Sequence, residues 1–199
     1  MKKFLFTIVA VLMAAPSFAQ FSSGGFSLDE EHLYWGVRFG INFSGIGGDI
    51  QSDKGRTGMT LGGVVGLRVT ESTPVFLESG LYYSQRGAKT LKGFNVADNV
   101  TKMEGHLNYL DIPLLIKYGI STENNVAILP LFGPYISFAL GGDTKYLKRS
   151  DMGFKLGCGV EWNNLYAEAF YQFGVVNIAD YHDASSHGNN LGINIGINF

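Results

Sequence analysis

The last nine residues of the chain alternate, without a break, between apolar side chains and side chains that are polar or very small. The apolar positions are Leu191, Ile193, Ile195, Ile197 and Phe199, and only glycine and asparagine stand between them. Successive side chains of a β-strand point to opposite faces, so this stretch predicts a strand with one apolar face and one narrow polar face. So apolar a face at the very end of a chain indicates a surface that meets lipid.

The same alternation recurs along the chain from residue 33 onward. We expect eight strands, separated by polar or glycine-rich connections, at residues 33–43, 58–70, 75–86, 110–118, 126–140, 151–162, 165–175 and 191–199. The connections alternate between long and short, as they do in outer-membrane barrels with an even number of strands. The sequence therefore predicts an all-β fold, an eight-stranded antiparallel up-and-down transmembrane β-barrel over residues 33–199.

Three local features refine this pattern. Asn163 and Asn164 are expected to form a two-residue hairpin turn, because asparagine tolerates positive φ. Pro130 and Pro134 cannot donate a hydrogen bond to a neighbouring strand, so we expect a bulge in the strand that contains them. The segments on both sides of residues 97–99 alternate weakly, which predicts a hairpin that projects beyond the membrane with its tip there.

Two kinds of eight-stranded barrel fit such alternation, a membrane barrel and a secreted soluble calyx of the lipocalin type. The interior of an eight-stranded barrel is only about wide enough for its own side chains. Large apolar residues on every strand would overfill it, whereas the opposite face, rich in small polar residues, would fit. This favours the membrane barrel, and an arginine at Ile195 is then expected to impair assembly more than one at Asn194, provided that the lumen has room.

The face predicted to point inward carries charged residues of both signs in nearly equal number. They are Arg38, Arg68, Glu78, Arg86, Asp111, Lys117, Lys155, Glu161 and Glu168. Buried charges are tolerated when they are paired and hydrogen-bonded, so we expect a polar network that plugs the barrel. A narrow charged passage is the alternative interpretation, and a proton relay or a catalytic site is a third.

The first nineteen residues have the features of a signal peptide. Lys2 and Lys3 are basic, and residues 4–15 form an apolar segment too short to span a bilayer as a helix. Small residues at the positions that a signal peptidase recognises predict cleavage after Ala19. We therefore expect a signal peptide at residues 1–19 and a flexible periplasmic leader at residues 20–32.

Composition narrows the range of ligands. The formal net charge is −2 and no basic patch is visible, so no nucleic-acid partner is expected. Cys158 is the only cysteine, which excludes an intramolecular disulfide, and at an outward position it is expected to be an inert apolar filler. Outward aromatic residues near strand ends are expected to form interfacial girdles; they are Trp35, Tyr83, Tyr118, Trp162 and Tyr171.

Candidate metal and catalytic residues are few. Potential metal ligands in the last polar loop are Asp180, His182, Asp183 and His187. Their spacing matches no strong metal motif, so neither a metal nor another cofactor is expected. An enzyme at the barrel rim would need a nucleophile or a general base, and His32 and His106 lie near strand ends, but no local motif marks a nucleophile beside them.

Four stretches resemble strands of a known family of small barrels. They are residues 109–118 (YLDIPLLIKY), 132–138 (FGPYISF), 165–174 (LYAEAFYQFG) and 191–199 (LGINIGINF). They are similar to the fourth, fifth, seventh and last strands of the small outer membrane protein β-barrel domain family, often labelled porin-like or PorT-like. The resemblance covers nearly all of the chain after the predicted cleavage site.

This resemblance implies a place in the bacterial outer membrane and insertion by the barrel-assembly machinery. That machinery recognises a C-terminal aromatic strand, so Phe199 would be the assembly signal. The PorT branch of the family is linked to protein secretion across the outer membrane.

The function expected from these observations is non-enzymatic. We expect a structural or interaction role, with outer-membrane lipid around the barrel, both termini in the periplasm, and an envelope protein as a possible partner of the outer loops. The alternatives are a narrow transport channel and a PorT-like accessory barrel of a protein-secretion system. A rim enzyme that modifies lipid A or peptides is the least favoured hypothesis.

Overall fold

The computed structural model describes residues 33–48, 51–70, 72–92, 104–122, 126–142, 150–176 and 186–199. The predicted signal peptide and leader, the hairpin tip at residues 97–99, and the residues His32, Asp180, His182 and Asp183 lie outside this part of the chain. In the part that is described, no helix is both long enough and apolar enough to cross a membrane.

The described residues form antiparallel strands. They are β1 (Leu33–Gly48), β2 (Gln51–Arg68), β3 (Val75–Lys92), β4 (Glu104–Tyr118), β5 (Ile120–Thr122), β6 (Val126–Gly142), β7 (Ser150–Trp162), β8 (Leu165–Gly174) and β9 (Ser186–Asn198). Each strand pairs with its neighbours in the order β4-β3-β2-β1-β9-β8-β7-β6-β5, and a β4–β6 pairing closes the barrel. The short β5 continues β4 beyond Gly119 and pairs with the same neighbour, β6. Because β4 and β5 occupy one strand position, the barrel has eight strands around its wall, as predicted.

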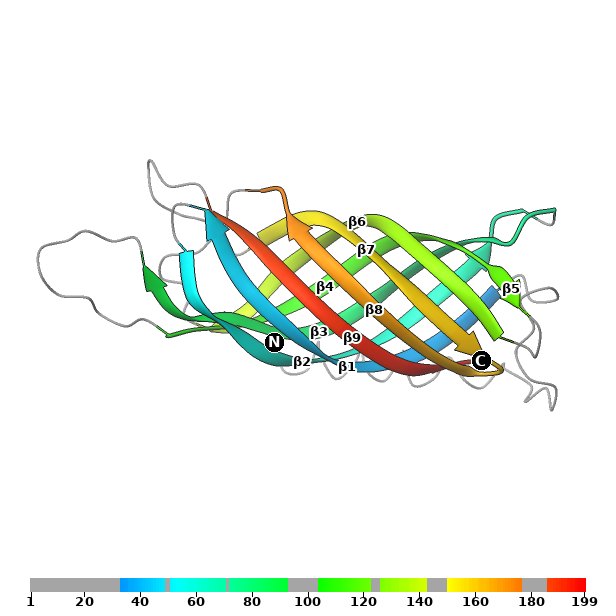
Figure 1. Cartoon of the computed structure of the whole chain (residues 1–199), viewed down its shortest axis with the longest axis horizontal. Coiled ribbons are helices and arrows are strands. Elements are labelled where there is room, and N and C mark those ends of the chain that lie inside the picture. Colours follow the sequence, from blue (N-terminus) through cyan, green and yellow to red (C-terminus); the bar gives the residue numbers. More distant parts are fainter. Residues whose placement is uncertain are drawn as a thin grey trace, which may run out of the picture.

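The two ends of the barrel differ. Figure 1 shows β1, β3 and β8 ending at one end, which we call the loop side, and β7 and the C-terminus at the other, the turn side. At the turn side, Asn163 and Asn164 join β7 to β8, and Asn163 has a φ of 53°. A positive φ there confirms the predicted two-residue turn, since asparagine adopts this conformation more readily than most residues.

The last strand, β9, pairs with the first strand, β1. Pairing between β1 and β9 runs from Gly36 opposite Asn198 to Gly48 opposite Ser186. Phe199 extends this seam, because its N–H donates to the Trp35 carbonyl (2.7 Å) and the Trp35 N–H donates to the Phe199 carbonyl (3.0 Å). Their rings are stacked with centroids 4.5 Å apart.

Burial follows the predicted alternation between inward and outward side chains. On β9, Ile195 is 59% exposed whereas the neighbouring Asn194 is 1% exposed. The same alternation holds on β7 and β8, where the outward side chains are apolar. The apolar face therefore lies outside, which confirms the membrane barrel over the soluble calyx.

Several strands are longer at the loop side than the sequence predicts. Pairing of β2 with β3 continues as far as Gln51 opposite Lys92, and pairing of β3 with β4 continues as far as Lys89 opposite Glu104. The expected start at residue 58 is thus wrong. Continued pairing of β3 with β4 past residues 86 and 110 agrees with the hairpin that was predicted to project beyond the membrane there. Above the membrane a strand no longer needs an apolar outward face, so the hydrophobic pattern ends before the hydrogen bonding does.

The predicted bulge at the prolines is also wrong. Pairing of β6 with β7 runs without a shift past Pro130 and Pro134, both of which are exposed on the outer face. The shift in β6 lies farther along, where Asn108 pairs with Gly141 and Tyr109 pairs with Ala139. A proline removes only one N–H from the ladder, and β6 accommodates that loss without inserting a residue.

Candidate functional site in the barrel interior

Charged side chains fill the interior. Of those predicted to lie there, the following are buried: Arg38, Glu78, Arg86, Asp111, Lys117, Lys155, Glu161 and Glu168. Asp151 joins them at 4% exposure, although it is not among the predicted interior residues. Asp151 lies on the same face of β7 as Lys155 and Glu161. Because it also lies next to a charged loop, the sequence alone did not distinguish it from the residues of that loop.

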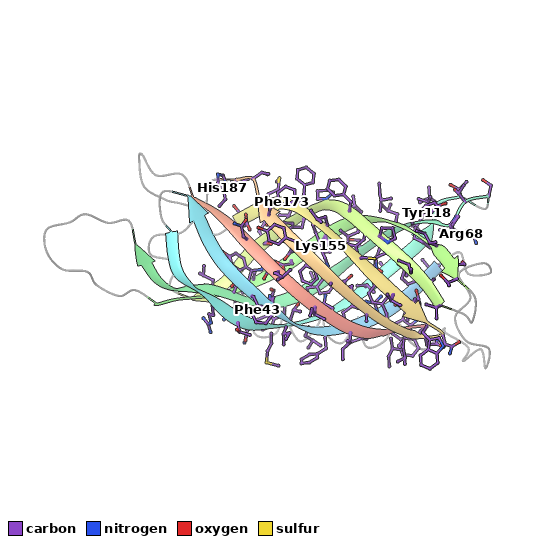
Figure 2. The ribbon with its side chains drawn as sticks, viewed as in Figure 1. Phe43, Arg68, Tyr118, Lys155, Phe173 and His187 are labelled. Carbon is purple, nitrogen blue, oxygen red and sulfur yellow. The ribbon has the colours of Figure 1, made fainter. Side chains whose placement is uncertain are left out.

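Arg68 was predicted to lie in the interior network, but it is not buried as the other predicted residues are. It is the last residue of β2, it is half-buried, and its Nε donates to the Thr70 carbonyl at 3.0 Å. Figure 2 shows Arg68 at the turn side, with Lys155 deeper in the barrel and His187 at the opposite end. The alternation along β2 correctly assigned Arg68 to the inward face. At the end of the strand, however, inward side chains lie at the open mouth of the barrel and are partly exposed.

Glu78 is the centre of the first group of contacts. Its Oε2 accepts hydrogen bonds from Lys117 Nζ and from the Tyr34 hydroxyl, both at 2.7 Å, and lies 3.7 Å from Arg38 Nη2. Lys117 Nζ also donates to the Tyr166 hydroxyl at 2.8 Å. Two cations and one phenol therefore surround this buried carboxylate.

Glu168 is the centre of a second group. Its Oε1 accepts from Lys155 Nζ (2.8 Å) and from Asn194 Nδ2 (2.7 Å), and its Oε2 accepts from the Tyr166 hydroxyl (2.9 Å). Tyr166 receives a hydrogen bond from Lys117, so it connects Glu168 with the Glu78 group.

Glu161 completes this part of the interior through Asn198. Asn198 Nδ2 donates to Glu161 Oε1 at 2.6 Å, and Asn198 Oδ1 accepts from Arg38 Nη2 at 2.5 Å. We call the combined set the turn-side cluster; its charged members are Arg38, Lys117, Lys155, Glu78, Glu161 and Glu168. Its positive and negative charges balance, as the stability of buried ions requires.

A separate loop-side cluster is formed by Arg86, Asp111 and Asp151. Arg86 Nη2 donates to Asp111 Oδ2 and, at 2.9 Å, to Gln172 Oε1, while its Nη1 lies 3.8 Å from Asp151 Oδ2. The Tyr135 hydroxyl donates to the same Asp151 oxygen at 3.1 Å. One cation here faces two carboxylates.

Apolar side chains close the turn side of the interior. Tyr34, Phe76, Leu129 and Tyr166 form a buried cluster, which we call the apolar floor. The Tyr34 and Phe76 rings meet edge to face with centroids 6.1 Å apart. The hydroxyls of Tyr34 and Tyr166 lie in the turn-side cluster, and the Tyr166 ring lies against the Arg38 guanidinium, so the floor and the ion pairs form one continuous filling.

Small cavities lie between these side chains, and two of them border the charged clusters. One has a volume of about 10 Å³ and is lined by Tyr82, Asp111 and Asn194, among others. The other, the loop-side cavity, has a volume of about 30 Å³ and is lined by residues that include Asp151 and Asn190. Pockets for organic ligands usually measure about 300 Å³ or more, so neither cavity fits such a substrate.

The described residues contain no group of three or more His, Cys, Asp or Glu side chains placed to hold a metal ion. His187 lies in β9, while the other three residues of the candidate loop set lie outside the described part. Cys158 is exposed on the outer face of β7. The predicted girdle residues Tyr83, Tyr118 and Trp162 also point outward, with 39%, 48% and 55% exposure.

A closed antiparallel barrel that is apolar outside and ion-paired inside defines a small transmembrane β-barrel. The family model described as outer membrane protein beta-barrel domain matches residues 18–199, and the chain belongs to this family. Membership places the protein in the bacterial outer membrane. Comparison with curated proteins finds no match.

Solved structures of other small barrels are similar. The outer membrane protein OprG from Pseudomonas aeruginosa is 12% identical with a TM-score of 0.51, and the match covers 87% of this chain and 99% of that one. Ail, the attachment invasion locus protein of Yersinia pestis, is 15% identical with a TM-score of 0.48, covering 85% and 100%. Neisserial surface protein A is 13% identical with a TM-score of 0.48, covering 83% and 97%. At these identities, the likeness to OprG speaks for the fold alone.

Proposed function

We propose that the protein is a closed, non-enzymatic outer-membrane barrel that conducts no ions and acts structurally or by binding a partner at its loop side. The observation that carries this proposal is the filled interior. Phe76 and Lys117 are each 1% exposed and Leu115 is fully buried, so side chains occupy the cross-section near the turn side. Ions crossing the barrel would have to displace both the apolar floor and the paired charges above it.

Conductance measurements test this proposal. The purified protein, inserted in planar lipid bilayers, should give no reproducible single-channel steps. As a control, a variant with both Glu78 and Lys117 replaced by alanine keeps the net charge but removes two side chains that cross the interior, and it shows whether the assay detects an opened barrel. Reproducible steps in the unmodified protein, shifted by Glu78→Gln, would overturn the proposal and favour a narrow channel.

The length of the loop-side strands supports the binding role. β2 and β3 have 18 residues each, whereas β8 has 10. A transmembrane strand needs about 9–11 residues, so β2 and β3 extend well beyond the bilayer. Paired strands that stand above the membrane offer a firm surface to another envelope protein.

Affinity purification from detergent-solubilised outer membranes tests for that partner. The matched control joins β3 to β4 just beyond the pair formed by Ala88 and Gly105, which shortens the β3–β4 part of the extension but keeps the transmembrane part. A stoichiometric protein that is lost in the shortened variant would support binding at the loop side. A clean monomer in both cases would leave the structural role, and stoichiometric secretion components would support the PorT-like accessory alternative.

The proposed orientation places the turn side, Phe199 and the N-terminal leader in the periplasm. The short connection at residues 163–164 supports it, because short turns of such barrels face the periplasm. N-terminal sequencing of the membrane form should give Gln20 as the first residue. Protease added to intact cells should cut only the loop-side connections; cleavage at the turn side would reverse the orientation.

A further inference from the structure

The charge balance of the interior fails at one place. The turn-side cluster is neutral, with three cations and three carboxylates, whereas the loop-side cluster has Arg86 against Asp111 and Asp151. Among the buried residues that the structure describes, one negative charge therefore remains uncompensated, and the three residues of this cluster are no more than 6% exposed. A buried, uncompensated charge is costly, so a further positive group is expected close to these carboxylates.

Hydrogen bonding fails at the same place. Asp111 Oδ1 and Asp151 Oδ1 are buried without a hydrogen-bond partner, whereas no oxygen of Glu78, Glu161 or Glu168 is left in that state. Asn190 Oδ1 also lacks a partner, although its Nδ2 donates to Gln172 Oε1 at 2.6 Å. These orphan atoms are acceptors, and nearly all buried acceptors in native structures find a donor or a cation.

The orphan oxygens of Asp151 and Asn190 belong to residues that line the loop-side cavity of about 30 Å³. Gly174 lies beside Asp151, and its lack of a side chain lets Asp151 Oδ1 and the Gly188 carbonyl oxygen come close together. A Cβ built at Gly174 would lie 2.9 Å from Asp151 Oδ1, 3.1 Å from the Gly188 carbonyl oxygen and 3.3 Å from Gly188 N. Two oxygen acceptors thus lie close together at a point where even a methyl group would be too tight.

We propose that the loop-side cavity, which Asp151, Gly188 and Asn190 all line, binds one partly dehydrated monovalent cation of about the size of sodium, held by Asp151 Oδ1, Asn190 Oδ1 and the Gly188 carbonyl. A single positive charge neutralises the loop-side cluster, whereas a divalent ion would reverse its sign. Hard cations prefer oxygen ligands, and magnesium keeps several of its waters, for which this cavity is too small. Arg86 does not occupy the space, because its two amino groups face Asp111, Gln172 and the other oxygen of Asp151.

The first test measures stability in different salts. The full protein, purified from outer membranes in a non-ionic detergent, is unfolded with urea in sodium chloride and in choline chloride of equal ionic strength. The folding equilibrium constant should rise with sodium and not with choline, by about tenfold when sodium is present at about ten times its dissociation constant. Equal stability in the two salts would overturn the proposal.

Matched variants locate the site. Asp151→Asn removes the excess charge and should abolish the difference between sodium and choline. Glu161→Gln makes the same acid-to-amide change in the neutral turn-side cluster and should keep that difference. A sodium effect that persists in Asp151→Asn would place the ion elsewhere and overturn the assignment.

A measurement on the unmodified protein is independent of whether these variants fold. Crystals grown with thallium(I) in place of sodium should show an anomalous peak between Asp151, Asn190 and Gly188. An ordered water at that position, with no anomalous signal, would overturn the proposal.

Discussion

An arginine at Ile195 tests which face of the barrel meets lipid. Ile195 lies four residues before Phe199, which pairs with Trp35 at the turn-side edge of the apolar surface. At a rise of about 3.4 Å per residue and a tilt of about 40°, this separation corresponds to a depth of about 10 Å. The apolar band of such barrels is about 25 Å tall, so Ile195 lies near the bilayer midplane.

A lipid-facing arginine near the midplane costs about 2–4 kcal/mol. Ile195→Arg should therefore lower the folding equilibrium constant by about 30- to 900-fold. The matched control is Leu33→Arg, another exposed outward position at 64% exposure, which lies two residues beyond Trp35 toward the turn side. At the interface the same side chain costs only about 0–1 kcal/mol.

The assay is reversible urea unfolding in phospholipid vesicles, followed by the fluorescence of Trp35 and Trp162. Equal losses for Ile195→Arg and Leu33→Arg would refute the depth argument, and a neutral Ile195→Arg would refute the lipid-facing assignment. Asn194→Arg is a poor control, because Asn194 is 1% exposed and its amide is bonded to Glu168, so the lumen lacks the room that a milder effect requires.

Three further predictions concern the interior and the turn. Glu78→Gln should destabilise the barrel by about 3–5 kcal/mol, since it leaves buried cations unpaired, and adding Lys117→Met should restore part of that loss in the same unfolding assay. Gly40→Ala should reduce the heat-modifiable fraction on gels, because its Cβ would overlap the Ile193 carbonyl, whereas Gly63→Ala, with its nearest neighbour 3.9 Å away, should fold normally. Asn163→Val should cost about 1–2 kcal/mol at a φ of 53°, and Asn163→Gly should cost almost nothing; equal costs would contradict the turn assignment.

The sequence predicted the faces of the strands well, because each side chain of a strand points either inward or outward. A shift of one residue would turn Ile195 inward and Asn194 outward, and the uninterrupted pattern of β9 excludes it. Strand ends were harder to predict, since pairing beyond the bilayer continues without an apolar face, as at Gln51 and Lys92. Asp151 and Arg68 both lie at strand ends, which is why the burial of the first and the partial exposure of the second were not predicted.

Parity assigns a face but does not say which charges meet. Glu78 stands opposite Leu115 in the β3–β4 register, yet its partner is Lys117, one inward position farther along β4. Lys155 stands opposite Gln172, yet it reaches Glu168, four residues away on β8. These pairings depend on the stagger of the strands and on the direction in which long side chains lie, and neither is visible in a single sequence.

The inward glycines explain how so many large side chains fit in a narrow barrel. A Cβ at Gly62 would collide with the Tyr82 ring, and one at Gly159 would lie 2.5 Å from the Tyr166 hydroxyl oxygen. Each of these glycines therefore leaves the volume in which the aromatic side chain of a neighbouring strand lies across the interior. The ring of Tyr166 in turn lies 3.9 Å from the Arg38 guanidinium. The inward glycines are thus what permits the barrel to be filled, because small residues on one strand make room for the rings that support the ion pairs.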